Sequence, residues 1–171
     1  MEICYDIKKI LKLSYEEYWN YLIKKYGKVN GDYFLTTEMK SINNKIKKGN
    51  AGLCIHHIDE DKAIMLSTPE FARKSPFNYQ KSDRLVYCNL LEHLILHTKI
   101  YFLNQNEFPS RFVLNYISQL INIYNGKQYR KKYYKKIAEI VLPEKENFIE
   151  YLKYFINKSK CLNYKIILDL L

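Results

Sequence analysis

Two short β-like runs and one clearly marked helix lie in the middle of this 171-residue chain. The first run, Leu53–Ile58, is apolar except for two adjacent histidines, and the second run is Leu85–Cys88. Asn89 follows at once with the side chain of a helix N-cap, and Glu92 is placed to complete a capping box. We therefore expect two strands and then a helix that reaches about Leu103.

All four histidines lie in this segment. His56 and His57 are neighbours on the first run, and neighbouring residues of a strand point to opposite faces. His93 and His97 share one face of the predicted helix. The helical pair can therefore bind one metal together with one member of the strand pair, while the other member faces a water. Three neutral imidazoles with an open position are typical of a catalytic metal site.

The stretch Ile55–Asp59, with Leu85–Tyr87 and Glu92–His97, resembles the motif of the HNH (ββα-metal) endonucleases. An adjacent histidine pair followed by two helical histidines is similar to the pattern in phage and bacterial HNH proteins and in the DNase colicins. The resemblance covers about residues 52–103 and none of the flanking helices.

This resemblance implies a role for each histidine. His56, His93 and His97 would bind one divalent metal, which could be Mg, Mn, Zn or Ni. His57 would be the general base that activates water for hydrolysis of a phosphodiester bond. Arg84 is a candidate for holding the scissile phosphate, because a guanidinium can bind phosphate through two hydrogen bonds.

The chain departs from the family pattern in two ways. The position of the family's middle asparagine is taken by Arg84, and the spacing of Asn89 makes it a helix cap. Asp83 or Asn78 would then have to brace the loop that holds the base. The long polar gap over residues 59–83 implies an insertion, either a loop that contacts the substrate or a surface loop.

Acidic residues lie next to both histidine pairs. Asp59, Glu60 and Asp61 follow the first pair and could orient a histidine or bind a second cation, although a solvated turn is the simpler interpretation. Glu92 is interpreted as a capping residue and not as a catalytic acid.

Positive charge points to a polyanionic partner. The net charge is +10 and the pI is near 9.3, which favours nucleic acid. In the segment Gln128–Lys136, cations alternate with tyrosines that can stack on bases, and the alternative is a solvated helical face with the tyrosines packed inward. The candidate phosphate contacts are Arg130, Lys131, Lys132, Lys135 and Lys136. The resemblance alone favours DNA.

A membrane protein or an exported protein is not expected. No apolar run approaches the roughly 18 residues of a spanning helix, and Met1–Leu13 lacks the apolar core of a signal peptide. No two cysteines form a C-x-x-C pair, so we expect reduced thiols and a cytoplasmic location.

The flanking regions have helical patterns. Ser14 and Glu17 open a helix that Gly27 can end, and a second helix is expected from Thr36–Thr37 to Gly49. Further helices are expected at Ser110–Tyr124, Tyr129–Val141 and Glu144–Ser159, with a weaker signal over 161–171. We predict one predominantly helical α+β domain with N-terminal helices (1–51), a small ββα-metal core (52–103) and a C-terminal helical region (104–171).

Two other functions stay open. The first is a catalytically inactive nucleic-acid-binding or interaction protein, such as a phage or mobile-element factor, whose histidines hold a structural metal. In that protein, metal removal would unfold the core and His57 would be dispensable. The second is an RNase.

Overall fold

The computed structural model describes residues 6–105 and 111–159, and this part of the chain is mostly helical with one two-stranded sheet. The helices are α1 (Ile7–Lys12), α2 (Tyr15–Tyr26), α3 (Pro69–Ala72), α4 (Leu90–Leu103), α5 (Arg111–Tyr124), α6 (Lys132–Val141) and α7 (Lys145–Ser159), and the strands are β1 (Cys54–His57) and β2 (Leu85–Cys88). The predicted α+β class dominated by helices is confirmed. None of the described helices is long and apolar enough to cross a membrane.

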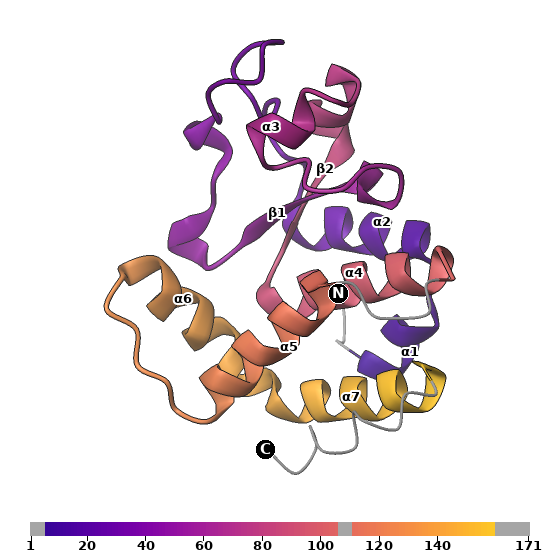
Figure 1. Ribbon diagram of the computed structural model, residues 1–171. Coiled ribbons are helices and arrows are strands. Elements are labelled where there is room, and N and C mark those ends of the chain that lie inside the picture. The colour runs from indigo at the N-terminus through magenta and orange to yellow at the C-terminus, as the bar shows by residue number, and fades with distance from the viewer. Residues whose placement is uncertain (1–5, 106–110, 160–171) are drawn as a thin grey trace.

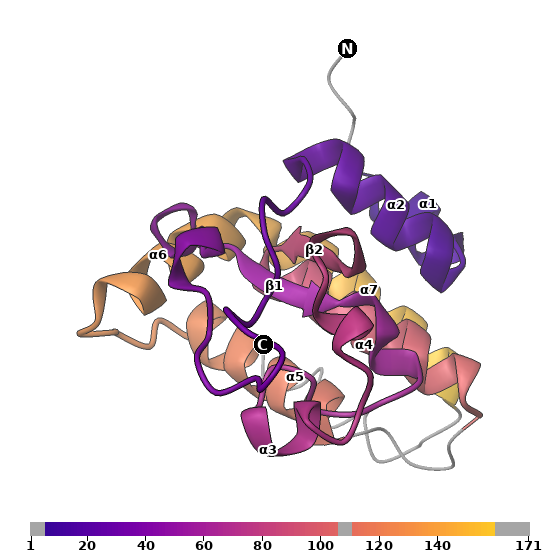
Figure 2. The ribbon, with the colours of Figure 1, turned by 90° about the horizontal axis from the view of Figure 1, so that it is seen from above.

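The two predicted strands form an antiparallel hairpin that leads directly into α4. His56 pairs with Val86 and His57 with Leu85 across the hairpin. In Figure 1 the hairpin connects an irregular lobe at the top, made of residues 28–53 and 58–84, with the helices below. Seen from above, α2 lies on one side of the hairpin and α3 on the other, so each histidine of the pair has its own surroundings (Figure 2).

Both capping boxes expected from the sequence are present. Ser14 and Glu17 exchange hydrogen bonds at the start of α2, which ends at Gly27 with a φ of +80°. At the start of α4, Glu92 accepts a hydrogen bond from the backbone N–H of Asn89 at 2.8 Å and another from Lys25 Nζ at 2.7 Å. Because both oxygens of the fully buried Glu92 carboxylate are engaged, its role as a capping residue is confirmed.

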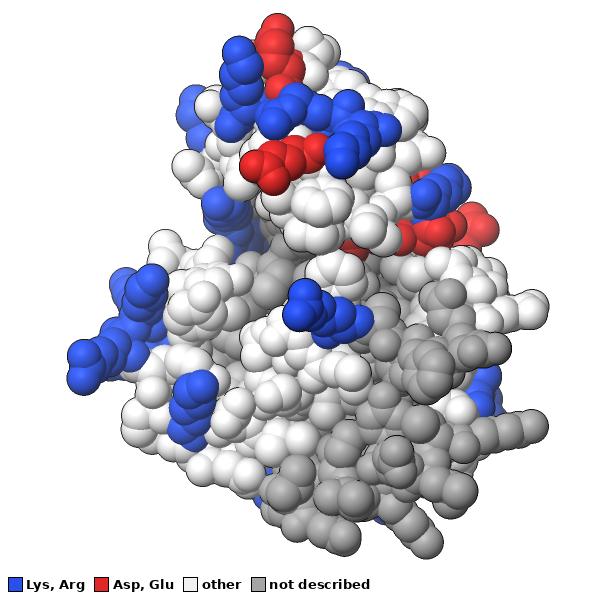
Figure 3. All heavy atoms as spheres, viewed as in Figure 1, with Lys and Arg blue, Asp and Glu red and all other residues white. Residues whose placement is uncertain are grey.

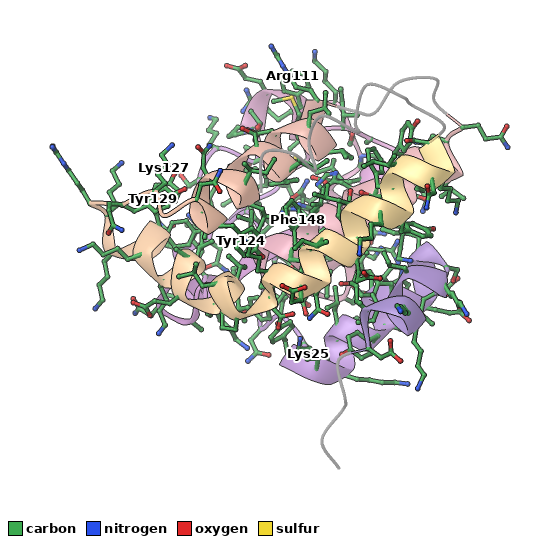
Figure 4. All side chains as sticks on the ribbon, turned by 90° about the horizontal axis from the view of Figure 1, so that it is seen from below. Lys25, Arg111, Tyr124, Lys127, Tyr129 and Phe148 are labelled. Atoms are coloured by element: carbon green, nitrogen blue, oxygen red, sulfur yellow. The ribbon has the colours of Figure 1, made fainter. Side chains whose placement is uncertain are left out.

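Helix α4 is the centre of the larger core. It is apolar on nearly all of its faces, as expected for a helix surrounded by protein. It packs against α5 and α2, and also contacts α6, α7 and the hairpin. Tyr124 of α5 and Phe148 of α7 close this core from below, with ring centroids 5.2 Å apart (Figure 4).

The prediction of a helix from Thr36–Thr37 to Gly49 is wrong. Phe34 and Ile42 instead form an isolated β-bridge, and only short 3-10 turns follow. Asn43 accounts for much of the difference, because its side chain accepts a hydrogen bond from Lys45 N and donates one to Asp32 O. The irregular path lets the apolar side chains of the lobe form a second core against β2: Val29, Tyr33, Phe34, Met39, Ile46, Leu53, Ala72, Leu85 and Tyr87.

The polar segment 59–83 lacks long elements, as predicted, but it is well packed. It winds through α3 and three 3-10 turns, Ile58–Asp61, Phe77–Gln80 and Ser82–Arg84. Leu66 and Gln80 are fully buried. This segment therefore places side chains against β1, as Gln80 does at His57.

The remaining helix predictions hold with shifted ends. Helix α6 begins at Lys132 and not at Tyr129, and α7 begins at Lys145 after a 3-10 turn at Leu142–Glu144. Helix α1, which Asp6 caps, was not expected. The predicted cap Ser110 and the helical signal over 161–171 lie outside the described residues.

Truncation of Leu94 in α4 should destabilise the fold strongly. Leu94 is fully buried, so we expect Leu94→Ala to lower the free energy of unfolding by about 2–5 kcal/mol. Leu114→Ala is the matched control, because Leu114 on α5 is 40% exposed and its loss should change stability by less than about 0.5 kcal/mol. Denaturant unfolding measures both. Equal losses would contradict the assignment of α4 to the centre of the core.

Candidate metal centre

The imidazoles of β1 and α4 meet beside the turn that follows β1. His93 and His97 lie one turn apart on α4, and their Nε2 atoms are 3.2 Å apart. The centroid of the His56 ring lies 5.1 Å from the centroid of each helical ring. The structure therefore brings together the three metal ligands that the sequence predicts.

Glu60 adds a fourth ligand to this group. Its Oε2 atom lies 3.2 Å from His97 Nε2 and 3.5 Å from His56 Nδ1. One ligand atom from each of the four residues lies within 4.8 Å of the others. Metal bonds of about 2.0–2.1 Å at tetrahedral angles put neighbouring ligand atoms roughly 3.3 Å apart. We conclude that the metal group, as we call His56, Glu60, His93 and His97, can hold a metal ion.

Burial sets the protonation of the metal group. It lowers the pKa of His97 to about 4 and the pKa values of His56 and His93 well below their usual range, so these imidazoles are neutral at neutral pH. It raises the pKa of Glu60 to about 8. A cation among the four side chains would favour the ionised carboxylate and accept the imidazole lone pairs. Neutral histidines and a carboxylate are the donors that divalent metals bind in proteins.

His57 is held beside the metal group by a side-chain amide. Its Nε2 atom lies 2.9 Å from Gln80 Oε1, while Gln80 Nε2 donates to the backbone oxygen of Leu66 at 3.2 Å. Because the amide oxygen can only accept, His57 must donate from Nε2–H, which leaves a lone pair on Nδ1. That Nδ1 atom is buried, has no hydrogen-bond partner and lies 4.0 Å from Glu60 Oε1.

Gln80, and not one of the three residues considered from the sequence, holds the ring of His57. Asn89 caps α4, as expected, and the other two candidates, Asn78 and Asp83, are exposed. Gln80 was missed because no periodic pattern marks one buried residue in a long polar segment. Glu60 was considered as an orienting group or as a ligand of a second cation, but a solvated turn was preferred, and that interpretation is wrong for this side chain, which is 12% exposed.

Aromatic side chains wall the site. Tyr116 of α5 lies over both helical histidines, with ring centroids 4.7 Å from that of His93 and 5.3 Å from that of His97. Phe112 stacks on His97 at 5.3 Å, and Tyr33 meets the ring of His57 edge-on at 4.5 Å. The rings hold the imidazoles in place and confine access to the site.

Arg84 binds a carboxylate of the protein itself. Its Nε and Nη2 atoms donate to the two oxygens of the buried Asp59 at 2.7 and 2.6 Å, and Lys62 also contacts Asp59 at 2.8 Å. This ion pair anchors the turn that carries Glu60. Arg84 also lines a surface pocket of about 400 Å³ beside Tyr15, so part of its side chain remains accessible.

The predicted phosphate contacts gather at the start of α6. Arg130, Lys131, Lys132 and Lys135 are exposed, while Lys136 is half-buried and pairs with Glu139. In Figure 3, cationic side chains project from this edge of the molecule, at the left of the view.

Helix α6 lies close to the strand that carries the histidines. Tyr133 places its hydroxyl 3.5 Å from Cys54 Sγ at the start of β1. A Cβ on Gly52 would lie 2.8 Å from the backbone oxygen of Lys136, so only glycine permits this close approach. The segment Gln128–Lys136, which we call the basic segment, is thus fixed against the beginning of β1, although none of its cations belongs to the metal group.

Comparisons with protein-family models, with curated proteins and with solved structures found no match for this chain.

Substitution of single histidines should separate ligands from non-ligands. We expect His93→Ala and His97→Ala to weaken zinc binding by more than the roughly 10–100-fold that partners outside the ligand set are worth. His57→Ala is the matched control and should bind zinc as the wild type does, because His57 Nδ1 lies outside the metal group. Isothermal titration calorimetry measures the affinities. Equal loss in all three variants would contradict the assignment.

Proposed function

We propose that this chain is a metal-dependent endonuclease that hydrolyses phosphodiester bonds. One observation carries the proposal. The buried His57 presents an unpaired Nδ1 lone pair toward the edge of a group that can hold a metal. A purely structural site has no use for such a base. The resemblance of the histidine pattern to the HNH nucleases supports the same reaction, and the strand–strand–helix order around the site is consistent with it.

His57 would accept the proton of the attacking water at Nδ1. Its neutral state at neutral pH leaves this atom available, and burial holds the pKa of His57 near 4 before any substrate charge is present. Gln80 would keep the ring in the tautomer that accepts this proton. As the proton arrives, the side-chain oxygen of Gln80 would stabilise the imidazolium through the same hydrogen bond.

His56, Glu60, His93 and His97 would hold the ion. When bound, the ion would supply positive charge that stabilises the charge developing on the phosphate and the leaving oxygen. Four protein ligands fill a tetrahedral ion but leave two positions on an octahedral one. The two free positions of an octahedral ion therefore favour Mn or Ni over Zn as the activating metal if Glu60 remains a ligand, whereas three imidazole donors suit Mg poorly.

The basic segment would bind the nucleic-acid backbone. Its cations are exposed at the start of α6, and Tyr133 and Tyr134 are 40% and 43% exposed, so they can stack on bases or sugars. The alternative interpretation, in which the tyrosines pack inward, does not describe these two side chains. DNA is proposed over RNA on the resemblance alone.

One observation favours a second candidate function. Glu60 completes a set of four protein ligands, and closed sets of four are typical of structural zinc. In that case the protein would be an inactive nucleic-acid-binding or interaction module, and metal removal would unfold the region around the hairpin.

Cleavage assays should separate the two functions. Wild-type protein is expected to cut plasmid DNA with Mn or Ni and to lose activity with a chelator, and Mg and Zn are tested alongside. His57→Ala should reduce cutting by at least about 100-fold, because a general base contributes roughly 10²–10⁴-fold, and should still bind metal. Single-stranded DNA and RNA are run alongside, so that an RNase is recognised by its substrate.

Two results would overturn the nuclease proposal. One is the absence of cutting on every substrate by folded, metal-loaded protein. The other is equal activity of wild type and His57→Ala.

Loss of the exposed lysines at the start of α6 should weaken nucleic-acid binding and should make that binding less dependent on salt. For Lys131→Ala, Lys132→Ala and Lys135→Ala combined, we expect the slope of log K against log salt to fall by up to about 2.7, since each phosphate contact contributes roughly 0.9. Lys12→Ala, Lys24→Ala and Lys28→Ala combined are the control, because these lysines are equally exposed and remove the same charge elsewhere. Fluorescence anisotropy with a DNA duplex measures both. Equal slopes would exclude α6 as the binding surface.

A further inference from the structure

The hydroxyl of Tyr15 connects helix α2 to the metal group. Tyr15 is the first residue of α2, where the capping box of Ser14 and Glu17 fixes the backbone. Its oxygen lies 2.8 Å from the backbone oxygen of Ile58 and 2.8 Å from His56 Nε2. The hydroxyl therefore touches a proposed metal ligand on the side away from Glu60.

The two contacts determine where the hydrogens lie. A backbone carbonyl can only accept, and a tyrosine hydroxyl carries a single hydrogen. If that hydrogen pointed to His56, the oxygens of Tyr15 and Ile58 would face each other at 2.8 Å with nothing between them. Tyr15 must therefore donate to Ile58 and accept the Nε2–H of His56.

We propose that Tyr15 is a positioning residue that fixes His56 as the Nε2–H tautomer, so that Nδ1 is the atom that binds metal. The inference rests on the metal group of the proposed function and does not depend on cleavage. His56 Nδ1 is buried without a hydrogen-bond partner among the described residues and lies 3.5 Å from Oε2 of Glu60, another member of the metal group. The bond to Ile58 also ties Tyr15 to the start of the turn that carries Glu60.

Removal of the hydroxyl should change the tautomer. In Tyr15→Phe, a hydrogen on His56 Nε2 would be buried without an acceptor, which is unfavourable. A hydrogen on Nδ1 could instead be donated to an oxygen of the Glu60 carboxyl group. That tautomer occupies the metal-binding lone pair, so metal would have to displace the hydrogen before it binds.

The experiment uses the full chain labelled with 15N-histidine. Long-range 1H–15N spectra of the metal-free protein report which ring nitrogen carries the hydrogen, and a His56→Ala variant assigns the signals. We expect Nε2–H in the wild type, an Nδ1–H population in Tyr15→Phe, and zinc affinity about 10–100-fold weaker in that variant by calorimetry. Tyr124→Phe is the matched control, because its hydroxyl also donates to a backbone oxygen, that of Val141 at 3.0 Å, away from the metal group. Tyr124→Phe should change neither the tautomer of His56 nor the zinc affinity.

Either of two results would overturn the proposal. The first is Nδ1–H on His56 in the wild type. The second is a Tyr15→Phe protein with an unchanged tautomer. Both readings are made without metal or substrate, so the absence of nuclease activity would leave the assignment of Tyr15 standing, and an unchanged tautomer would leave the nuclease proposal standing.

Discussion

Helix α4 is enclosed by protein on almost every side, so each polar group that it carries must find its partner inside the fold. Glu92 has Asn89 and Lys25, and Thr98 bonds to the backbone oxygen of Leu94 and the hydroxyl of Tyr151. Among the described residues, His93 and His97 contact each other, His56, Glu60 and the rings of α5, and the hydroxyl of Tyr116 lies 3.5 Å from His93 Nε2. Buried polar groups without partners are costly. A bound cation would therefore supply a partner for the ring nitrogens of His93 and His97.

Strand β1 also carries buried polar groups that need partners, and it carries them on both of its faces. His56 and His57 point to different faces of β1 and have different partners, Tyr15 on one face and Gln80 on the other. The Nδ1 atoms of both histidines nevertheless approach Glu60, because the chain turns back immediately after the strand. Glu60 is thus the junction between the metal-binding side and the side of the proposed base. Its position depends on Arg84 and Lys62, which anchor Asp59 next to it.

The parts of this arrangement that could be predicted from sequence are those with local signals. Capping boxes and apolar runs identified the paired strands and α4 correctly, and the histidine pattern named three of the four side chains that meet in the metal group. Tyr15 and Gln80 act over 41 and 23 residues of chain, and a single polar residue in a helix start or a loop has no pattern that reveals such a contact. The helix expected after Thr36–Thr37 failed for a related reason. Hydrogen bonds made by Asn43, together with a second core, outweigh local helical preference there.

Four protein ligands are compatible with the proposed catalysis because the four side chains are held with different rigidity. His56 is held by a strand, and His93 and His97 by the most buried helix, so their positions are fixed by the fold. Glu60 lies in a 3-10 turn and has the longest flexible side chain of the group. If one ligand yields to a substrate oxygen, Glu60 is the one that the fold releases most easily. Its Oε1 atom also lies 4.0 Å from His57 Nδ1, so an oxygen that replaced it would arrive beside the proposed base. As a fourth ligand, Glu60 by itself suggests a structural site. In the proposed chemistry, however, it would occupy the position that a substrate oxygen takes.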